Sequence, residues 1–195
     1  MEIKILDDKY QFTLRVSAII YNKVLNRILL FKVNNRDFYL LPGGKVERLE
    51  HSINSLKREM IEEIGEEYSK INFEFYGISE EFVNDKGINN HQLNIVYKGI
   101  YQNTIKDIKF NGKEGDWINF EWMDINELDN INLYPVQIKN VIKNYNSSFH
   151  IIEDNISSWN FNRDKIKIRK KKELNIIIII NSFFYIITFP SKLHI

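Results

Sequence analysis

The stretch "LPGGKVERLEHSINSLKREMIEEIGEE", from Leu41 to Glu67, decides the fold and indicates the chemistry. A short apolar run ends at Pro42-Gly43-Gly44, and the hydrophobic period then changes. Apolar residues recur at steps of three and four, which is typical of an amphipathic helix, and Gly65 stands where a helix C-terminus favours glycine. The stretch therefore predicts a strand, a glycine loop and a helix over about Glu50–Ile64; its apolar positions are Ile53, Leu56, Met60 and Ile64.

Acidic residues cluster near the end of this predicted helix. Five glutamates and no lysine or arginine occur between Glu59 and Glu67. Glu59, Glu62 and Glu63 share one helix face opposite the apolar stripe, where each like-charge pair costs about 0.2–0.5 kcal/mol. A solvated acidic helix is the simpler alternative. A bound divalent cation would remove the repulsion, and carboxylate oxygens suit Mg²⁺ or Mn²⁺.

The loop before the helix fits the same interpretation. Gly43 and Gly44 allow a close backbone approach, and the Gly44 carbonyl is a further metal ligand candidate. Arg58 adjoins Glu59 and is expected to hold that carboxylate or to contact phosphate. A metal held by carboxylates neutralises phosphate charge and activates water, so this arrangement favours hydrolysis of a phosphoanhydride.

The same stretch resembles the signature of the Nudix (MutT-like) hydrolase family, G-x(5)-E-x(7)-R-E-U-x-E-E-x-G-U, where U is aliphatic. Residues 44–66 fill every specified position of this box except the last, where Glu66 replaces an aliphatic residue; we expect this to affect packing. Eight positions in one register make a specific signal. The matching residues are Gly44, Glu50, Arg58, Glu59, Met60, Glu62, Glu63 and Gly65.

The resemblance implies roles for these residues. Glu59, Glu62 and Glu63 match the positions that bind divalent metal, and one of them, or an acid outside the box, would serve as general base. Arg58 matches the arginine that orients a box glutamate. Glu50 and Gly44 match positions that assist the metal or the loop. The family cleaves a nucleoside diphosphate linked to another moiety X.

Other site residues are less constrained. Some relatives carry a further acid in a strand after the box, but His91-Gln92 occupies that position here, which leaves four other acids to consider: Glu80, Glu81, Glu114 and Glu121. Arg15, Arg36 and Lys45 are candidate substrate-binding residues. Phe38 and Tyr39 either stack on a base or pack in the core. Trp117, Trp122 and Trp159 belong to no recognisable motif.

The rest of the chain supplies strands and short helices. "FTLRVSAIIY" and "RILLFKV" predict a hairpin, and "INFEFYGIS", "HQLNIVYKGIY" and "NFEWM" predict strands after the box. Asp124 is expected to cap a short helix, and "YPVQIKNVIKNY" predicts a last helix with Pro135 in its first turn. This order, together with the resemblance, predicts an α/β fold, a Nudix-like α/β/α sandwich with a mixed sheet.

Composition changes near residue 150. Residues 1–150 carry a net charge of −3, unlike a general nucleic-acid binder, and residues 151–195 carry +4. We therefore expect a hydrolase domain over 1–150 and an Ile/Lys/Asn-rich tail over 151–195. Three alternatives stay open for the tail: a membrane anchor over 174–190 behind a basic flank, a β-hairpin around Asn181-Ser182, or a non-functional extension.

These features lead to one main hypothesis and one alternative. The main hypothesis is a Mg²⁺- or Mn²⁺-dependent pyrophosphohydrolase acting on a small nucleotide, and the alternative is a catalytically silent nucleotide-binding or regulatory module on the same fold. The absence of cysteine and of a signal-peptide pattern suits the cytoplasm. A membrane-tethered enzyme and a homodimer both stay open.

Overall fold

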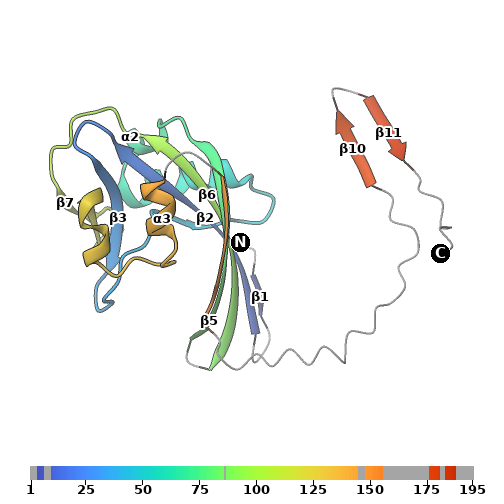
Figure 1. Cartoon of the computed structure of the whole chain (residues 1–195), viewed down its shortest axis with the longest axis horizontal. Coiled ribbons are helices and arrows are strands. Elements are labelled where there is room, and N and C mark those ends of the chain that lie inside the picture. Colours follow the sequence, from blue (N-terminus) through green and yellow to red (C-terminus); the bar gives the residue numbers. More distant parts are fainter. Residues whose placement is uncertain are drawn as a thin grey trace. The chain divides into compact units, whose positions relative to one another are not determined.

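The computed structural model describes residues 4–6, 10–85, 87–144, 148–155, 176–180 and 183–187. The chain divides into two compact units, Met1–Ser157 and Ser158–Ile195. The first unit is built on a mixed sheet whose strands run in the order β7-β8-β3-β2-β6-β5-β9 (Figure 1). Its strands are β1 (Lys4–Leu6), β2 (Tyr10–Asn22), β3 (Arg27–Val33), β4 (Gly43–Lys45), β5 (Glu74–Asp85), β6 (Ile88–Ile100), β7 (Lys109–Gly112), β8 (Gly115–Asp124) and β9 (Phe149–Asp154).

The sheet combines both strand directions. β2 pairs in parallel with β6, and β5 pairs in parallel with β9, while the other neighbours run antiparallel. β2 and β3 form the hairpin expected from the sequence. Asn26 adopts a left-handed backbone (φ 53°) in its turn, and the Leu25 amide donates to Asn22 Oδ1. Asparagine tolerates this conformation better than most residues.

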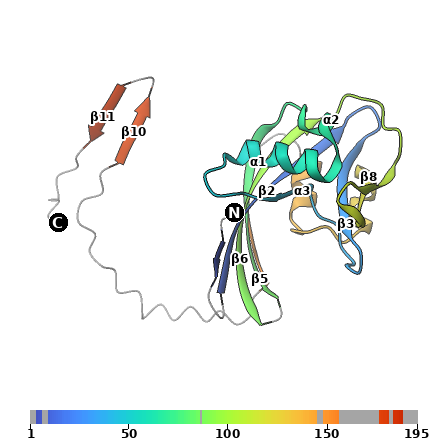
Figure 2. The ribbon, with the colours of Figure 1, turned by 180° about the vertical axis from the view of Figure 1, so that it is seen from behind.

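Helices cover both faces of the sheet. α1 lies on the face turned toward the viewer in Figure 2, and α3 lies on the other, toward the viewer in Figure 1. β2 alternates between two cores: Ala18 and Ile20 belong to the core that contains Leu56, whereas Ile19 belongs to the core that contains Ile138. This confirms the predicted α/β/α sandwich. The helices are α1 (Ser52–Glu59), the π-helical η1 (Met60–Ile64), α2 (Glu66–Ser69), the 3₁₀-helix η2 (Ile125–Asn130) and α3 (Ile138–Lys143).

The helix of the decisive stretch begins two residues later than expected and ends at Ile64 as expected. Its last turn widens into η1, where the Gly65 amide donates to the Met60 carbonyl five residues back (2.8 Å). Gly65 has a φ of +156°, which favours glycine and stops the helix. Such π-turns occur often at functional sites. The widened turn carries Glu62 and Glu63.

η2 begins where the sequence predicts it, whereas α3 begins later than predicted. Asp124 caps η2, because its Oδ1 accepts from the Asn126 amide (2.9 Å). α3 begins only at Ile138, three residues after Pro135, because a turn precedes it in which the Ile138 amide donates to the Pro135 carbonyl (3.0 Å).

The first unit extends past the compositional boundary at residue 150. β9 crosses that boundary, since it pairs with β5 from Gly77–Phe149 to Phe82–Asp154, and the unit ends at Ser157. The start of the expected tail therefore belongs to the sheet.

The second unit contains an antiparallel hairpin of β10 (Ile176–Ile180) and β11 (Phe183–Ile187), with Ile176 opposite Ile187. This is the pairing that the hairpin alternative for the tail describes. The membrane-anchor alternative over 174–190 lies partly outside the described residues. Within the described ranges, no helix has the length and apolar character needed to cross a bilayer.

The core beneath α1 gives a stability test. Leu56 is fully buried, whereas Ile61 is 45% exposed on the next turn. Replacing Leu56 with alanine should lower the free energy of unfolding by about 2–5 kcal/mol, because the lost side chain leaves a cavity. Ile61→Ala should cost less than about 1 kcal/mol. Urea denaturation of both variants measures the difference, and equal costs would contradict the packing described here.

Candidate active site

Two adjacent glycines let the loop pass between β2 and the helix. β4 pairs with β2, placing Ser17 opposite Gly43 and Val16 opposite Gly44. A Cβ on Gly43 would lie 2.2 Å from the Val16 carbonyl oxygen, and the φ of Gly43 is +140°. A Cβ on Gly44 would lie 2.1 Å from the Cδ of Glu59. Gly44 therefore makes the space in which the Glu59 carboxylate lies.

Arg58 holds several of the glutamates together. Its Nη1 donates to Glu59 Oε1 (2.9 Å) and to Glu62 Oε2 (3.0 Å). Its Nε and Nη2 donate to the two oxygens of Glu50 (3.2 and 3.1 Å). Nη2 also reaches the carbonyl of Lys45 (3.2 Å), which ties the helix to the loop. Because these hydrogen bonds favour its charged form, the pKa of Arg58 is raised.

Glu63, unlike the glutamates bonded to Arg58, is buried and has an oxygen without a hydrogen-bond partner. Its side chain is 8% exposed, and its Oε2 is buried without a hydrogen-bond partner. Burial, followed by the charge of Glu59, raises the pKa of Glu63 to about 8, against the opposing effect of Arg15. Burial raises the pKa of Glu59 as well. An unpaired buried carboxylate oxygen is costly and requires a functional explanation.

Arg15 faces this carboxylate pair from β2. Its Nη2 donates to the Gly43 carbonyl (2.7 Å), and its charge acts on Glu63 and Glu59. Burial lowers the pKa of Arg15. Arg15 therefore stabilises the glycine loop and partly balances the buried negative charge.

A cavity of about 490 Å³ brings these groups together. All three substrate-binding candidates, Arg15, Arg36 and Lys45, line it. Glu50 and Glu62 do not appear in its wall and instead bond to Arg58. The wall also includes box residues and distant residues from the β7–β8 region: Gly43, Gly44, Glu47, Arg58, Glu59, Glu63, Glu114, Trp117 and Ile118.

One of the four further acids lies in this cavity. Glu114, in the β7–β8 turn, lines the wall and contributes to the raised pKa of Glu63. Glu80 instead faces His150 (2.6 Å) and His91 (3.6 Å), and Glu121 accepts from Tyr39 (2.8 Å) and pairs with Lys109.

Glu81, the last of the four, is held by neighbouring polar groups outside this wall. Its oxygens accept from Ser79 (3.0 Å) and Gln92 (3.0 Å). The aromatic residues before the loop also have partners elsewhere, since Phe38 contacts Tyr134 edge to face and Tyr39 bonds to Glu121. Core and surface packing therefore accounts for both aromatic residues.

The donor set fits a divalent cation in its chemistry. Carboxylates and a backbone carbonyl are the ligands that Mg²⁺ prefers, and the unpaired Glu63 oxygen offers a free ligand. The carboxylates do not converge on one point, because Arg58 engages Glu59 and Glu62. Accordingly, among the described residues no three acidic or histidine side chains are close enough to enclose an ion. Arg58 engages one oxygen of Glu59 and one of Glu62.

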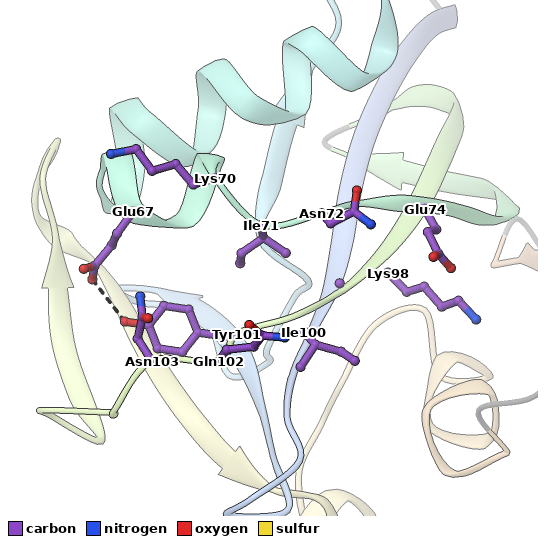
Figure 3. Close-up of a pocket in the computed structure, with 11 residues that line it drawn as sticks. Glu67, Lys70, Ile71, Asn72, Glu74, Lys98, Ile100, Tyr101, Gln102 and Asn103 are labelled. Carbon is purple, nitrogen blue, oxygen red and sulfur yellow. Dashed lines mark hydrogen bonds between the residues drawn. The ribbon is translucent and has the colours of Figure 1, made fainter.

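A larger hollow of about 690 Å³ lies elsewhere (Figure 3). It lies between α2 and the end of β6, and the Tyr101 hydroxyl donates to Glu67 across it (3.2 Å). No residue between Gly44 and Gly65 lines it. The smaller cavity is therefore the candidate active site, since the charged groups converge there.

Comparison with known proteins agrees with this geometry. The family model for the NUDIX domain matches residues 11–145. The dihydroneopterin triphosphate pyrophosphohydrolase of E. coli has a similar structure, with 14% identity, a TM-score of 0.53, and coverage of 68% of this chain and 93% of that one. A search of curated proteins gives no match.

Two MutT proteins are also similar in structure. The one from Bacillus halodurans shows 22% identity and a TM-score of 0.48, covering 67% of this chain and 80% of that one. The one from Methanosarcina mazei Go1 shows 21% identity and a TM-score of 0.47, covering 72% and 96%. At such identities structural likeness bears on the fold alone, so the family match is the stronger finding.

The buried Glu63 carboxyl predicts a pH-dependent stability. Its pKa is raised in the fold, so the folded chain holds a proton that the unfolded chain releases above about pH 4.5, and stability falls as pH rises toward 8. The Glu63→Gln variant lacks this titrating carboxyl. In chelator-treated protein, the stability advantage of Glu63→Gln over the parent should grow by on the order of 2 kcal/mol between pH 5 and pH 8.

Urea denaturation at the two pH values measures this change. Glu74→Gln is the control, because Glu74 is exposed and its replacement removes a carboxyl outside the buried site. An advantage of Glu63→Gln that stays constant with pH would contradict the buried, unpaired state of Glu63.

Proposed function

This chain belongs to the Nudix family of pyrophosphohydrolases, and from that premise we propose that its cavity binds a nucleoside diphosphate linked to a second moiety and, with a divalent cation, hydrolyses the pyrophosphate bond. One observation supports the proposal above the others. The buried Glu63 oxygen has no hydrogen-bond partner, and it lies in the wall of a cavity that also presents Glu59, Arg36 and Lys45. Such a carboxylate suits a cation whose other ligands are phosphate oxygens.

The glutamates divide into ligands and positioned partners. We assign Glu59, Glu62 and Glu63, with the Gly44 carbonyl, to hold Mg²⁺ or Mn²⁺. The cation, when bound, neutralises phosphate charge and lowers the pKa of a water molecule. Glu50 was expected to assist the metal or the loop; its two-pronged bond to Arg58 supports a positioning role instead.

The basic residues have two roles: some position the carboxylates and the loop, and others are assigned to the substrate. Arg58 orients Glu59 and Glu62 and keeps the helix against the loop. Arg15 holds the Gly43 carbonyl and balances the buried carboxylates. Arg36 and Lys45, which line the cavity, are assigned to the phosphate groups of the substrate, because cationic side chains are the usual partners of phosphate.

Removal of the proton from the attacking water needs a base. Glu63 and Glu114 are our two candidates, because both line the cavity and their charges interact, whereas Glu59 in the same wall is bonded to Arg58. A bound cation would favour the ionised form of Glu63, against the burial that raises its pKa. We assign the base to this pair, and Glu80, Glu81 and Glu121 are bonded elsewhere.

The experiment is hydrolysis by the purified full chain with Mg²⁺ on a panel of nucleoside diphosphate derivatives, with products identified by mass. Glu63→Gln should lower kcat by roughly 100- to 1,000-fold, the range that loss of an acid–base or charge-stabilising group produces, and a chelator should abolish turnover. Glu66→Gln is the matched control, because Glu66 is exposed and pairs with Lys70, and its rate should stay within about twofold.

Two results would contradict the proposal. One is an absence of hydrolysis across the panel despite metal-dependent nucleotide binding, which would support the silent binding module. The other is full activity in Glu63→Gln, which would remove Glu63 from the chemistry.

A further inference from the structure

We propose that Trp117 forms an aromatic stacking subsite in the wall of the active-site cavity and that it binds the flat heteroaromatic ring of the substrate. The inference rests on the proposed function and narrows its substrate class. It assigns the contact with the base to one residue, which the proposed function leaves open. Trp117 belongs to no sequence motif, and only the fold brings it to the site.

The exposure of Trp117 is the first observation. Trp117 is 48% exposed, whereas Trp122 on the same strand is 1% exposed in the core. The exposed ring is in a concave site, since Trp117 lines the same cavity as Glu59, Glu63 and Arg36. Ligand pockets typically combine aromatic side chains with a few charged or polar groups, as this wall does.

The backbone beneath Trp117 is fixed on both sides. The Asn34 amide donates to the Trp117 carbonyl (2.8 Å). The Asn34 side chain donates to the carbonyl of Asp116 (2.9 Å), and Asn111 donates to the Asp116 carboxylate (2.8 Å). The loop after β3 and strand β7 therefore both hold the residues that carry the indole.

Gly115 leaves room for the indole. A Cβ on Gly115 would lie 2.8 Å from Trp117 Cδ1 and 3.0 Å from its Nε1. The φ of Gly115 is +145°, a conformation that other residues rarely adopt. The ring thus lies against bare backbone on one side. A stacking platform held in place loses little conformational freedom when a ligand binds.

The remaining wall suits the rest of a nucleotide. Arg36 is anchored by its guanidinium over the Phe38 ring (5.6 Å) and lines the cavity together with Lys45. The cavity volume of about 490 Å³ is in the range of small-molecule sites. Stacking platforms accept every base, because each base has a π-face. Trp117 would therefore select for an aromatic ring without selecting one base.

Kinetics on two substrate types test the subsite. The base-bearing substrate is a nucleoside diphosphate sugar that the parent hydrolyses, and the base-free one is 5-phosphoribosyl 1-pyrophosphate. Trp117→Ala should raise KM for the base-bearing substrate about tenfold, as expected for a lost stacking contact, with a much smaller change for the base-free one. Trp117→Phe should restore KM to within about threefold. The matched control is Phe75→Ala, because Phe75 is 57% exposed and lies outside this cavity.

A binding measurement separates this inference from the proposed function. Tryptophan fluorescence is followed during titration with ADP and with inorganic pyrophosphate, each with Mg²⁺. ADP should quench the parent strongly, pyrophosphate should quench it weakly, and Trp117→Phe should remove the ADP-specific quenching. This pattern supports the subsite even if no substrate is hydrolysed. Equal KM changes for both substrate types, or quenching that persists in Trp117→Phe, would overturn it.

A change of oligomeric state in the Trp117→Ala variant would give a different explanation for the exposed ring. If Trp117→Ala converts a dimer to a monomer in sedimentation and leaves nucleotide affinity unchanged, Trp117 is a contact between copies of the chain, and the subsite is wrong.

Discussion

The site depends on one arginine that holds three carboxylates of like charge. Arg58 contacts Glu50, Glu59 and Glu62 at 2.9–3.2 Å and also reaches the carbonyl of Lys45. Without it, repulsion would drive the carboxylates apart and the helix would lose its link to the glycine loop. Since each of its hydrogen bonds is charge-assisted, the arrangement is stronger than an exposed ion pair of the same geometry.

This arrangement leaves one carboxyl oxygen without a hydrogen-bond partner, and that oxygen connects the fold to its chemistry. Gly44 provides the space for Glu59, the π-turn carries Glu62 and Glu63, and burial leaves a Glu63 oxygen without a partner. Arg15 offsets part of the negative charge from β2. In our account a divalent cation would offset the rest, so replacing Glu63 with an uncharged residue should stabilise the protein when no cation is bound. Stability and function are opposed at this position.

Local sequence signals predicted much of the site and little of its surroundings. The helix, its stop at Gly65 and the hairpin of β2 and β3 follow from hydrophobic period and turn residues, which act over a few positions. The spacing placed Glu59, Glu62 and Glu63 on one helix face away from the core, whereas Glu63 is buried in the cavity wall and Glu62 bonds to Arg58 outside that wall. The π-turn was not predicted, because it depends on how the Gly65 amide meets the Met60 carbonyl.

Features that depend on pairing between distant strands were not predicted either. β9 was assigned to the tail from its composition, whereas pairing with β5 places it in the sheet. Glu114 was one of four equivalent acids and Trp117 had no signal at all, since only strand pairing across about 80 residues brings them to the cavity.

The central claim is that Glu59, Glu62 and Glu63 form a site for a divalent cation. The most direct measurement is anomalous scattering from a crystal of the full chain grown with Mn²⁺ and a slowly hydrolysed nucleoside diphosphate analogue. The account predicts a peak about 2.1 Å from carboxylate oxygens of Glu59 and Glu63, with Glu62 turned away from Arg58. A fully occupied ligand with no manganese peak at these glutamates, and with Glu59 and Glu62 still bonded to Arg58, would contradict it.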